Sequence, residues 1–312
     1  MKLELADSVI EKAVRLATAG GSDEAVYHRE REELYRIEDP EDREAAFQTF
    51  YRRWFLASRL EDPLWEALAE VPGVRDSVGR WCVSDACRAS EEGAELYVSP
   101  DQELSDQERR VLVLRLLPET LVERTRLLWL LRRELLHVAD MVDPAFAYQP
   151  RLPAAAVGPV HDDLLRTRYA VLWSTTVVGR IERRGQAPEG TRDTARTRFL
   201  RAFSMLGDKA EEIFERLFRG ERPSHGDLVK LAREPRETAG LAPGAGMRCP
   251  VCGSPTYVRE TGDSLEGEVV ACLQAEKPHW RPEQGLCPRC ADLYRVRSGV
   301  FGAAPPPSRL SR

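Results

Sequence analysis

Four of the seven cysteines form two Cys-x-x-Cys pairs near the C-terminal end of the chain. These are Cys249 with Cys252 and Cys287 with Cys290, and 34 residues separate the two pairs. Each pair places two thiols on one tight turn, and two such turns can enclose a tetrahedral ion with metal–sulfur bonds of about 2.3 Å. Gly253 follows the first pair and allows a positive φ there. The spacing therefore predicts one zinc ion per chain, bound by these four residues.

The segment from Arg248 to Arg297 resembles the knuckles of zinc ribbons and rubredoxin-like modules. The resemblance implies a structural zinc, because four thiolates leave no open coordination position for catalysis. Iron in a rubredoxin-like site, or redox-active or fortuitous cysteines, are the alternatives. Trp280, between two prolines, is expected to pack on this module. Cys82 and Cys87 have a spacing that no common metal knuckle uses and are interpreted as buried or semi-buried structural thiols, with a metal or redox role as the alternative.

A second group of side chains that could take part in catalysis or metal binding lies near the middle of the chain. An apolar strand from Val111 to Leu117 leads into a helix that Pro118 opens and that ends at Asp143. The group consists of Arg133, Glu134, His137 and Asp140. Residues three and four apart are neighbours on a helix surface, so this group could form pairs.

This strand followed by a helix with x-Glu-Leu-x-His resembles the active-site helix of zincin metallopeptidases. In that family two histidines four residues apart bind zinc, and the glutamate after the first activates water. The resemblance implies Glu134 as general base, His137 as ligand and Asp143 as a third ligand. Arg133 occupies the place of the first histidine, and a guanidinium has no lone pair with which to bind a metal.

Three interpretations of this helix stay open. The group is a polar network on a zincin-like scaffold that has lost its metal, or an ordinary core helix with charges facing water. Alternatively, Glu134, His137 and Asp143 form a working site with a ligand from elsewhere. The first is favoured, so the sequence does not settle whether the chain is an enzyme and favours a non-catalytic role.

Most of the remaining sequence shows helical periodicity. A helix opened by Asp39-Pro40 carries aromatic residues at intervals of three and four up to Phe55. Core packing is the preferred interpretation of these aromatic residues, with a ligand pocket as the alternative. A further helix is predicted to include Val78 to Cys82, and residues 94–99 are predicted to form a strand beside 111–116.

These patterns predict a mainly α (α+β) fold. Residues 1–235 are expected to form a mostly helical domain with a small sheet and a zincin-like strand–helix core. A Gly/Pro/Ala-rich linker at 236–247, a zinc ribbon at 248–298 and a disordered tail at 299–312 are expected to follow.

Composition narrows the function classes. The net charge is −5 and the hydrophobic fraction is 42%. An acidic balance disfavours a general nucleic-acid surface, although binding through the ribbon stays an alternative. No apolar run suggests a transmembrane segment or a signal peptide. The sequence predicts a cytoplasmic zinc-binding protein with an interaction or scaffold role and a protein partner. A metal-dependent hydrolase, specifically a peptidase, is the second possibility. Substrate, partner identity and oligomeric state are not given by the sequence.

Overall fold

A computed structural model describes residues 2–153, 159–220, 222–241, 247–253, 255–256 and 259–298. The expected tail at 299–312 lies outside the described residues. The fold is mainly helical with a small four-stranded mixed sheet, which confirms the predicted fold class. None of the helices within the described residues combines the length and apolar character needed to cross a membrane.

The chain divides into two compact units. The first comprises Met1–Pro150, Thr176–Arg192 and Arg222–His225, and the second comprises Arg151–Thr175, Asp193–Glu221 and Gly226–Arg312. The domain boundaries predicted from the sequence at 236–247 stay a prediction.

The first unit is built on strands β1, β2, β4 and β3, which lie side by side in this order. β2 is parallel to both β1 and β4, whereas β3 is antiparallel to β4. The elements of this unit, in chain order, are β1 (Lys2–Leu5), α1 (Asp7–Thr18), α2 (Glu24–Leu34), α3 (Pro40–Ala57), α4 (Asp62–Ala69), α5 (Pro72–Ser77), β2 (Arg80–Asp85), a 3₁₀ turn (Ala89–Glu91), β3 (Gly93–Val98), α6 (Asp106–Arg109), β4 (Arg110–Leu116), α7 (Pro118–Val122) and α8 (Arg124–Val142).

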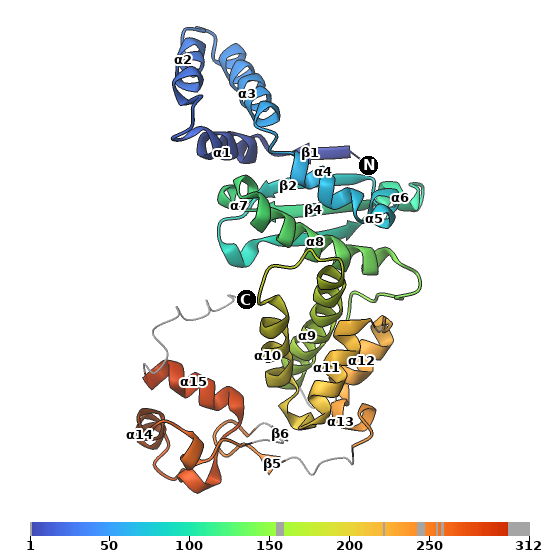
Figure 1. Cartoon of the computed structure of the whole chain (residues 1–312), viewed down its shortest axis with the longest axis vertical. Coiled ribbons are helices and arrows are strands. Elements are labelled where there is room, and N and C mark those ends of the chain that lie inside the picture. Colours follow the sequence, from blue (N-terminus) through green and yellow to red (C-terminus); the bar gives the residue numbers. More distant parts are fainter. Residues whose placement is uncertain are drawn as a thin grey trace. The chain divides into compact units, whose positions relative to one another are not determined.

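One face of the sheet is buried. Alternate residues of β4 point to this face, and its three leucines Leu112, Leu114 and Leu116 are at most 1% exposed. Trp81 of β2 lies opposite Leu112 in the register and is fully buried. Helix α8 crosses the unit in front of the strands and contacts β3, α4 and α5 (Figure 1). The predicted pairing of 94–99 with 111–116 is confirmed as the antiparallel pair β3–β4.

Two local predictions were wrong. Residues 80–82 belong to β2 rather than to a helix, because β2 pairs with strands from distant parts of the chain on both sides. Gly79, directly before β2, allows the backbone at Gln107 to lie close to it, since a Cβ on residue 79 would be 2.7 Å from the Gln107 carbonyl oxygen. The helix opened by Pro118 is interrupted at Glu123, whose extended backbone and side chain cap the start of α8.

The second unit consists mainly of helices. Helix α9 (Pro159–Arg183) begins in this unit, and its residues from Thr176 onward belong to the first unit. The elements that follow α9, in chain order, are α10 (Thr191–Ala202), a 3₁₀ turn (Ser204–Leu206), α11 (Lys209–Arg219), α12 (His225–Arg233), α13 (Pro235–Thr238), β5 (Met247–Arg248), β6 (Pro255–Thr256), a 3₁₀ turn (Gly262–Ser264), α14 (Gly267–Glu276), a 3₁₀ turn (Pro282–Gln284) and α15 (Pro288–Ser298). Helices α10 and α11 bury a phenylalanine cluster, in which Phe199 stacks on Phe203 and contacts Phe214.

Candidate metal centre

The first cysteine pair lies on the turn between β5 and β6. These two strands are antiparallel, with Arg248 opposite Pro255. Within the turn the Gly253 N–H donates to the Cys249 carbonyl oxygen at 2.8 Å, and Gly253 has a φ of 72°. That positive φ is the conformation glycine adopts without steric cost. The turn directs both thiols toward the same side.

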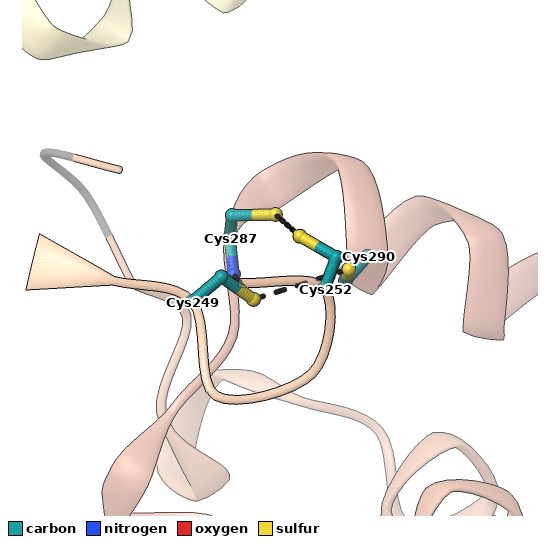
Figure 2. A group of neighbouring side chains, drawn as sticks. All are labelled: Cys249, Cys252, Cys287 and Cys290. Carbon is teal, nitrogen blue, oxygen red and sulfur yellow. Dashed lines mark hydrogen bonds between the residues drawn. The ribbon is translucent and has the colours of Figure 1, made fainter. Parts of the chain in front are cut away.

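The second pair lies at the start of α15. Cys287 precedes the helix, Pro288 is its first residue, and Cys290 follows in the first turn (Figure 2). Proline suits the first helical position because its N–H would have no partner there. A two-way backbone pairing between Glu260 and Leu286 fixes the chain immediately before Cys287. The helix start also carries partial positive charge, which favours thiolates.

The four sulfurs converge on one point, and all lie within 4.8 Å of one another (Figure 2). The Sγ atoms of Cys249 and Cys290 are 3.9 Å apart, and those of Cys252 and Cys287 are 3.8 Å apart. A tetrahedron with metal–sulfur bonds of about 2.3 Å has edges of about 3.8 Å. A disulfide would require about 2.05 Å. The spacing therefore fits one shared metal ion and excludes disulfides in this arrangement.

The pKa shifts of the cysteine thiols bear on how the cluster could bind a cation. The pKa of Cys287 is lowered to about 5, first because the Cys290 thiol acts as hydrogen-bond donor to its thiolate. The same interaction, followed by burial, raises the pKa of Cys290, and burial raises that of Cys249. The Cys287 thiol therefore loses its proton readily, whereas the Cys249 and Cys290 thiols resist deprotonation. A divalent ion would balance several thiolates at once, with release of protons.

The cluster is part of a small hydrophobic core. Cys249, Cys287 and Cys290 are buried, while Cys252 is exposed. Their neighbours in this core are Leu265, Val269, Leu273, Trp280, Leu286, Ala291 and Tyr294. Trp280 is 5% exposed and its Nε1 donates to the Gly285 carbonyl oxygen at 3.1 Å. Its predicted role in packing is confirmed.

Arg259 connects the segments that carry the two cysteine pairs. Its Nη2 donates to the Arg248 carbonyl oxygen at 2.6 Å and its Nη1 to the Gln284 carbonyl oxygen at 3.1 Å. Arg248 and Gln284 precede the first and second pair by one and three residues. The sequence interpretation missed Arg259, because a lone arginine in a loop gives no signal of the two carbonyls that it will reach.

The central helix α8 holds the other predicted site residues. The Glu134 carboxylate lies against the start of β3, where the Ala94 N–H donates to its Oε2 at 3.5 Å, and its Oε1 is 3.2 Å from Arg133 Nη2. The side chain is 16% exposed. Burial raises the pKa of the Glu134 carboxyl, and the charge of Arg133 opposes that rise.

His137 is one turn further along the helix. Burial lowers its pKa to about 4, with the charge of Asp140 acting in the opposite direction. The imidazole is therefore neutral at physiological pH. A neutral imidazole is the form that binds metals, but it is equally the ordinary state of a core histidine.

Asp140 and Asp143 have partners of their own. Asp140 accepts two hydrogen bonds from Arg180 of α9, at 2.8 and 2.5 Å. The exposed Asp143 accepts from the Ala145 N–H at 2.9 Å, which closes the turn after α8. Within the part of the chain that the structure describes, the four cysteines are the only group of three or more potential ligands close enough to share an ion.

Comparisons of the chain with protein-family models, with curated proteins and with solved structures gave no match. The likenesses to zinc ribbons and zincins therefore rest on motifs alone. The sequence and the structure agree on a four-cysteine cluster near the C-terminus whose geometry is consistent with a zinc site.

Proposed function

We propose that the chain is a zinc protein in which one Zn²⁺ holds the C-terminal segment together. Its ligands are Cys249, Cys252, Cys287 and Cys290. The observation that carries this proposal is the convergence of the four sulfurs within 4.8 Å, with two spacings that match the edge of a zinc–thiolate tetrahedron. A four-thiolate sphere has no position for substrate, so the role of the ion is structural.

The structural role follows from the size of the segment. Strands β5 and β6 contain two residues each, and the core has ten buried residues. A segment of this size has too little apolar area to fold securely alone. Binding energy from a structural zinc supplies the missing folding energy.

The main function that we infer is an interaction or scaffold role on a metallopeptidase-like core without its own ion. Two ion pairs support this inference. Arg133 stands in the place of a ligand and pairs with Glu134, and Asp140 is engaged by Arg180. The first ion pair engages the carboxylate that a hydrolase would need as its general base, and the second engages another carboxylate of the same polar group.

The nearly balanced charge of the C-terminal segment favours a protein as the partner. Residues 247–312 contain nine Lys/Arg and seven Asp/Glu, which is nearly balanced. Nucleic-acid binding usually shows as a strong basic excess. The proposed location remains the cytoplasm, where reduced thiols favour metal ligation over disulfides.

Elemental analysis of the purified full-length protein tests the proposal. We expect one zinc per chain, lost in Cys287→Ser and retained in the matched control Cys87→Ser, since Cys87 is exposed and outside the cluster. One iron in place of zinc, or metal that survives Cys287→Ser, would contradict it. A second metal that disappears in His137→Ala would favour a metal-dependent hydrolase with Glu134 as base.

Nucleic-acid binding through the C-terminal segment is tested separately. Retention on immobilised DNA or RNA at low salt that falls steeply with added salt would support this alternative over a protein partner. Absence of retention at low salt excludes it.

A further inference from the structure

The first three helices enclose a pocket that has no part in the proposed zinc site. Its volume is about 260 Å³, which suits a small molecule. Residues of α3 at intervals of three and four form one wall, namely Glu44, Phe47, Gln48 and Tyr51. Helix α1 and the end of α2 provide the others.

The base of the pocket is rigid. Tyr51 is 6% exposed, and its hydroxyl accepts a hydrogen bond from Arg31 Nε at 3.1 Å. A hydrogen bond to the same hydroxyl is the first cause of the raised pKa of Arg15. Tyr27 is 3% exposed, and its pKa is raised to about 12, first by burial and then by the neighbouring Tyr51. Aromatic rings and guanidinium groups therefore hold one another in place.

One wall is aromatic and partly open to solvent. The rings of Tyr35 and Phe47 meet edge to face with centroids 5.1 Å apart. The Arg31 guanidinium lies 5.4 Å from the first ring centroid and 5.8 Å from the second. Tyr35 remains 55% exposed. Such a surface favours a flat apolar or aromatic group.

Most charges that line the pocket are already paired, and two are not. Asp7 pairs with Arg52 at 3.2 Å and Glu11 with Arg15 at 2.6 Å. By contrast, Arg31 and Glu44 form no ion pair with each other or with any other residue in the described ranges. The unpaired charges are one positive and one negative.

We propose that this pocket binds a small zwitterion with an aromatic body, of the class of a free aromatic α-amino acid. Its carboxylate meets the Arg31 guanidinium, whose Nη groups make no hydrogen bond within the described part of the chain. Its ammonium group meets Glu44, and its ring lies on Tyr35 and Phe47. A guanidinium fork is the side-chain group best matched to a carboxylate. The Gln48 amide is available for a further hydrogen bond.

The charge pattern is the reason for choosing a zwitterion over a simple anion or cation. An anion at Arg31 would be repelled by Glu44, and a cation at Glu44 by Arg31. A molecule that carries both charges satisfies both groups. The pocket belongs to the first unit, so this inference stands independently of the zinc proposal.

Isothermal titration calorimetry on the full-length protein tests the proposal with L-phenylalanine and three partial ligands. These are 3-phenylpropionate without the ammonium group, phenethylamine without the carboxylate, and L-alanine without the ring. We expect L-phenylalanine to bind and each partial ligand to bind at least about tenfold more weakly, because a charged hydrogen-bonded contact is lost or the aromatic contact is missing.

The variant Glu44→Gln should weaken L-phenylalanine about tenfold and should not weaken 3-phenylpropionate, which has no ammonium group for Glu44 to contact. Glu41→Gln on the same helix is the matched control, because Glu41 is exposed and does not line the pocket. Glu44 is also exposed, so this variant is expected to fold. Three results would each overturn the proposal: L-phenylalanine binding weaker than about 10 mM, equal affinity of 3-phenylpropionate and L-phenylalanine, or equal loss in both variants.

Discussion

The Asp140 carboxylate of α8 and the Arg180 guanidinium of α9 face each other through two parallel contacts, Nη1–Oδ1 at 2.8 Å and Nη2–Oδ2 at 2.5 Å. The two side chains are 12% and 11% exposed. In the sequence Asp140 belongs to a group of polar side chains on one helix with Arg133, Glu134 and His137. In the structure its carboxylate joins α8 to the end of α9, which belongs to the same unit.

Asp140→Ala is expected to lower the free energy of unfolding by about 3–5 kcal/mol, because it leaves a buried guanidinium without its partner. Replacing both residues, as in Asp140→Leu with Arg180→Met, should recover most of this loss, since no buried charge remains. Urea unfolding monitored by circular dichroism measures the free energy of unfolding of the single and the double variant. A loss below about 1 kcal/mol in the single variant would mean that solvent reaches Arg180 freely.

The stability of the protein should fall in mild acid because of His137. Its folded-state pKa of about 4 lies below the unfolded value of 6.5. Between these values the unfolded chain binds the proton first, so stability is unaffected above about pH 7 and declines as pH falls toward 4. The full effect is about 3 kcal/mol.

Urea unfolding of the wild type and His137→Gln from pH 7.5 to 4 isolates this effect. The raised pKa of Glu134 acts in the opposite direction, because the folded state then binds a proton before the unfolded state does. That contribution and the acid release of zinc are present in both proteins, so their difference reports on His137. An unfolding free-energy difference that does not change with pH would contradict the burial of a neutral imidazole.

Removing zinc with a chelator should unfold the segment 247–298 locally. The two-residue strands β5 and β6 and the small core around Trp280 cannot compensate for a lost binding energy of about 10–16 kcal/mol. Hydrogen exchange measured by mass spectrometry should show loss of protection in α14 and α15 and unchanged protection in α8. Protection should return when zinc is added back. Retained protection in metal-free protein would show that the segment folds without the ion.

Gly285 should matter more for zinc affinity than Gly253. Both have positive φ, at 58° and 72°, but a Cβ at Gly285 would lie 2.8 Å from the Glu260 carbonyl oxygen, whereas one at Gly253 would meet no atom within 4 Å. Gly253→Ala should cost only about 1 kcal/mol, because alanine is less stable than glycine at positive φ. This free energy corresponds to a loss of zinc affinity of about fivefold. Gly285→Ala must also displace the pairing before Cys287, and a loss above about thirtyfold is expected. Competition with a chromophoric chelator measures both, and equal losses would contradict this.

The sequence predicted the features that depend on local spacing. Two Cys-x-x-Cys pairs specify a metal cluster because the ligands of each pair are three residues apart. The apolar run from Val111 to Leu117 likewise predicted a strand, and the structure has β4 there. Three of the aromatic residues of α3, namely Phe50, Tyr51 and Phe55, are buried as the core interpretation predicted, whereas Phe47 is only partly buried and lines the pocket between the first three helices.

Features that depend on distant partners could not be predicted in this way. β2 becomes a strand because it lies between β1 and β4, and a short run such as Val78 to Cys82 does not reveal those neighbours. Arg180 lies 40 residues from Asp140 in the sequence, and the two side chains meet only in the folded chain. The roles of Glu134 and His137 in catalysis stay a prediction, as does the protein partner.

The order of the strands has a consequence for synthesis on the ribosome. Of the four strands β1 is translated first, but its first residues pair with Arg80 and Trp81 of β2. The other neighbour of β2 is β4, which ends at Leu116. Because β4 lies between β2 and β3, the strand translated last occupies an inner position of the sheet. Contacts between residues far apart in sequence form slowly. The nascent chain must therefore keep the apolar residues of β1 and β2 from aggregating until β4 has left the exit tunnel.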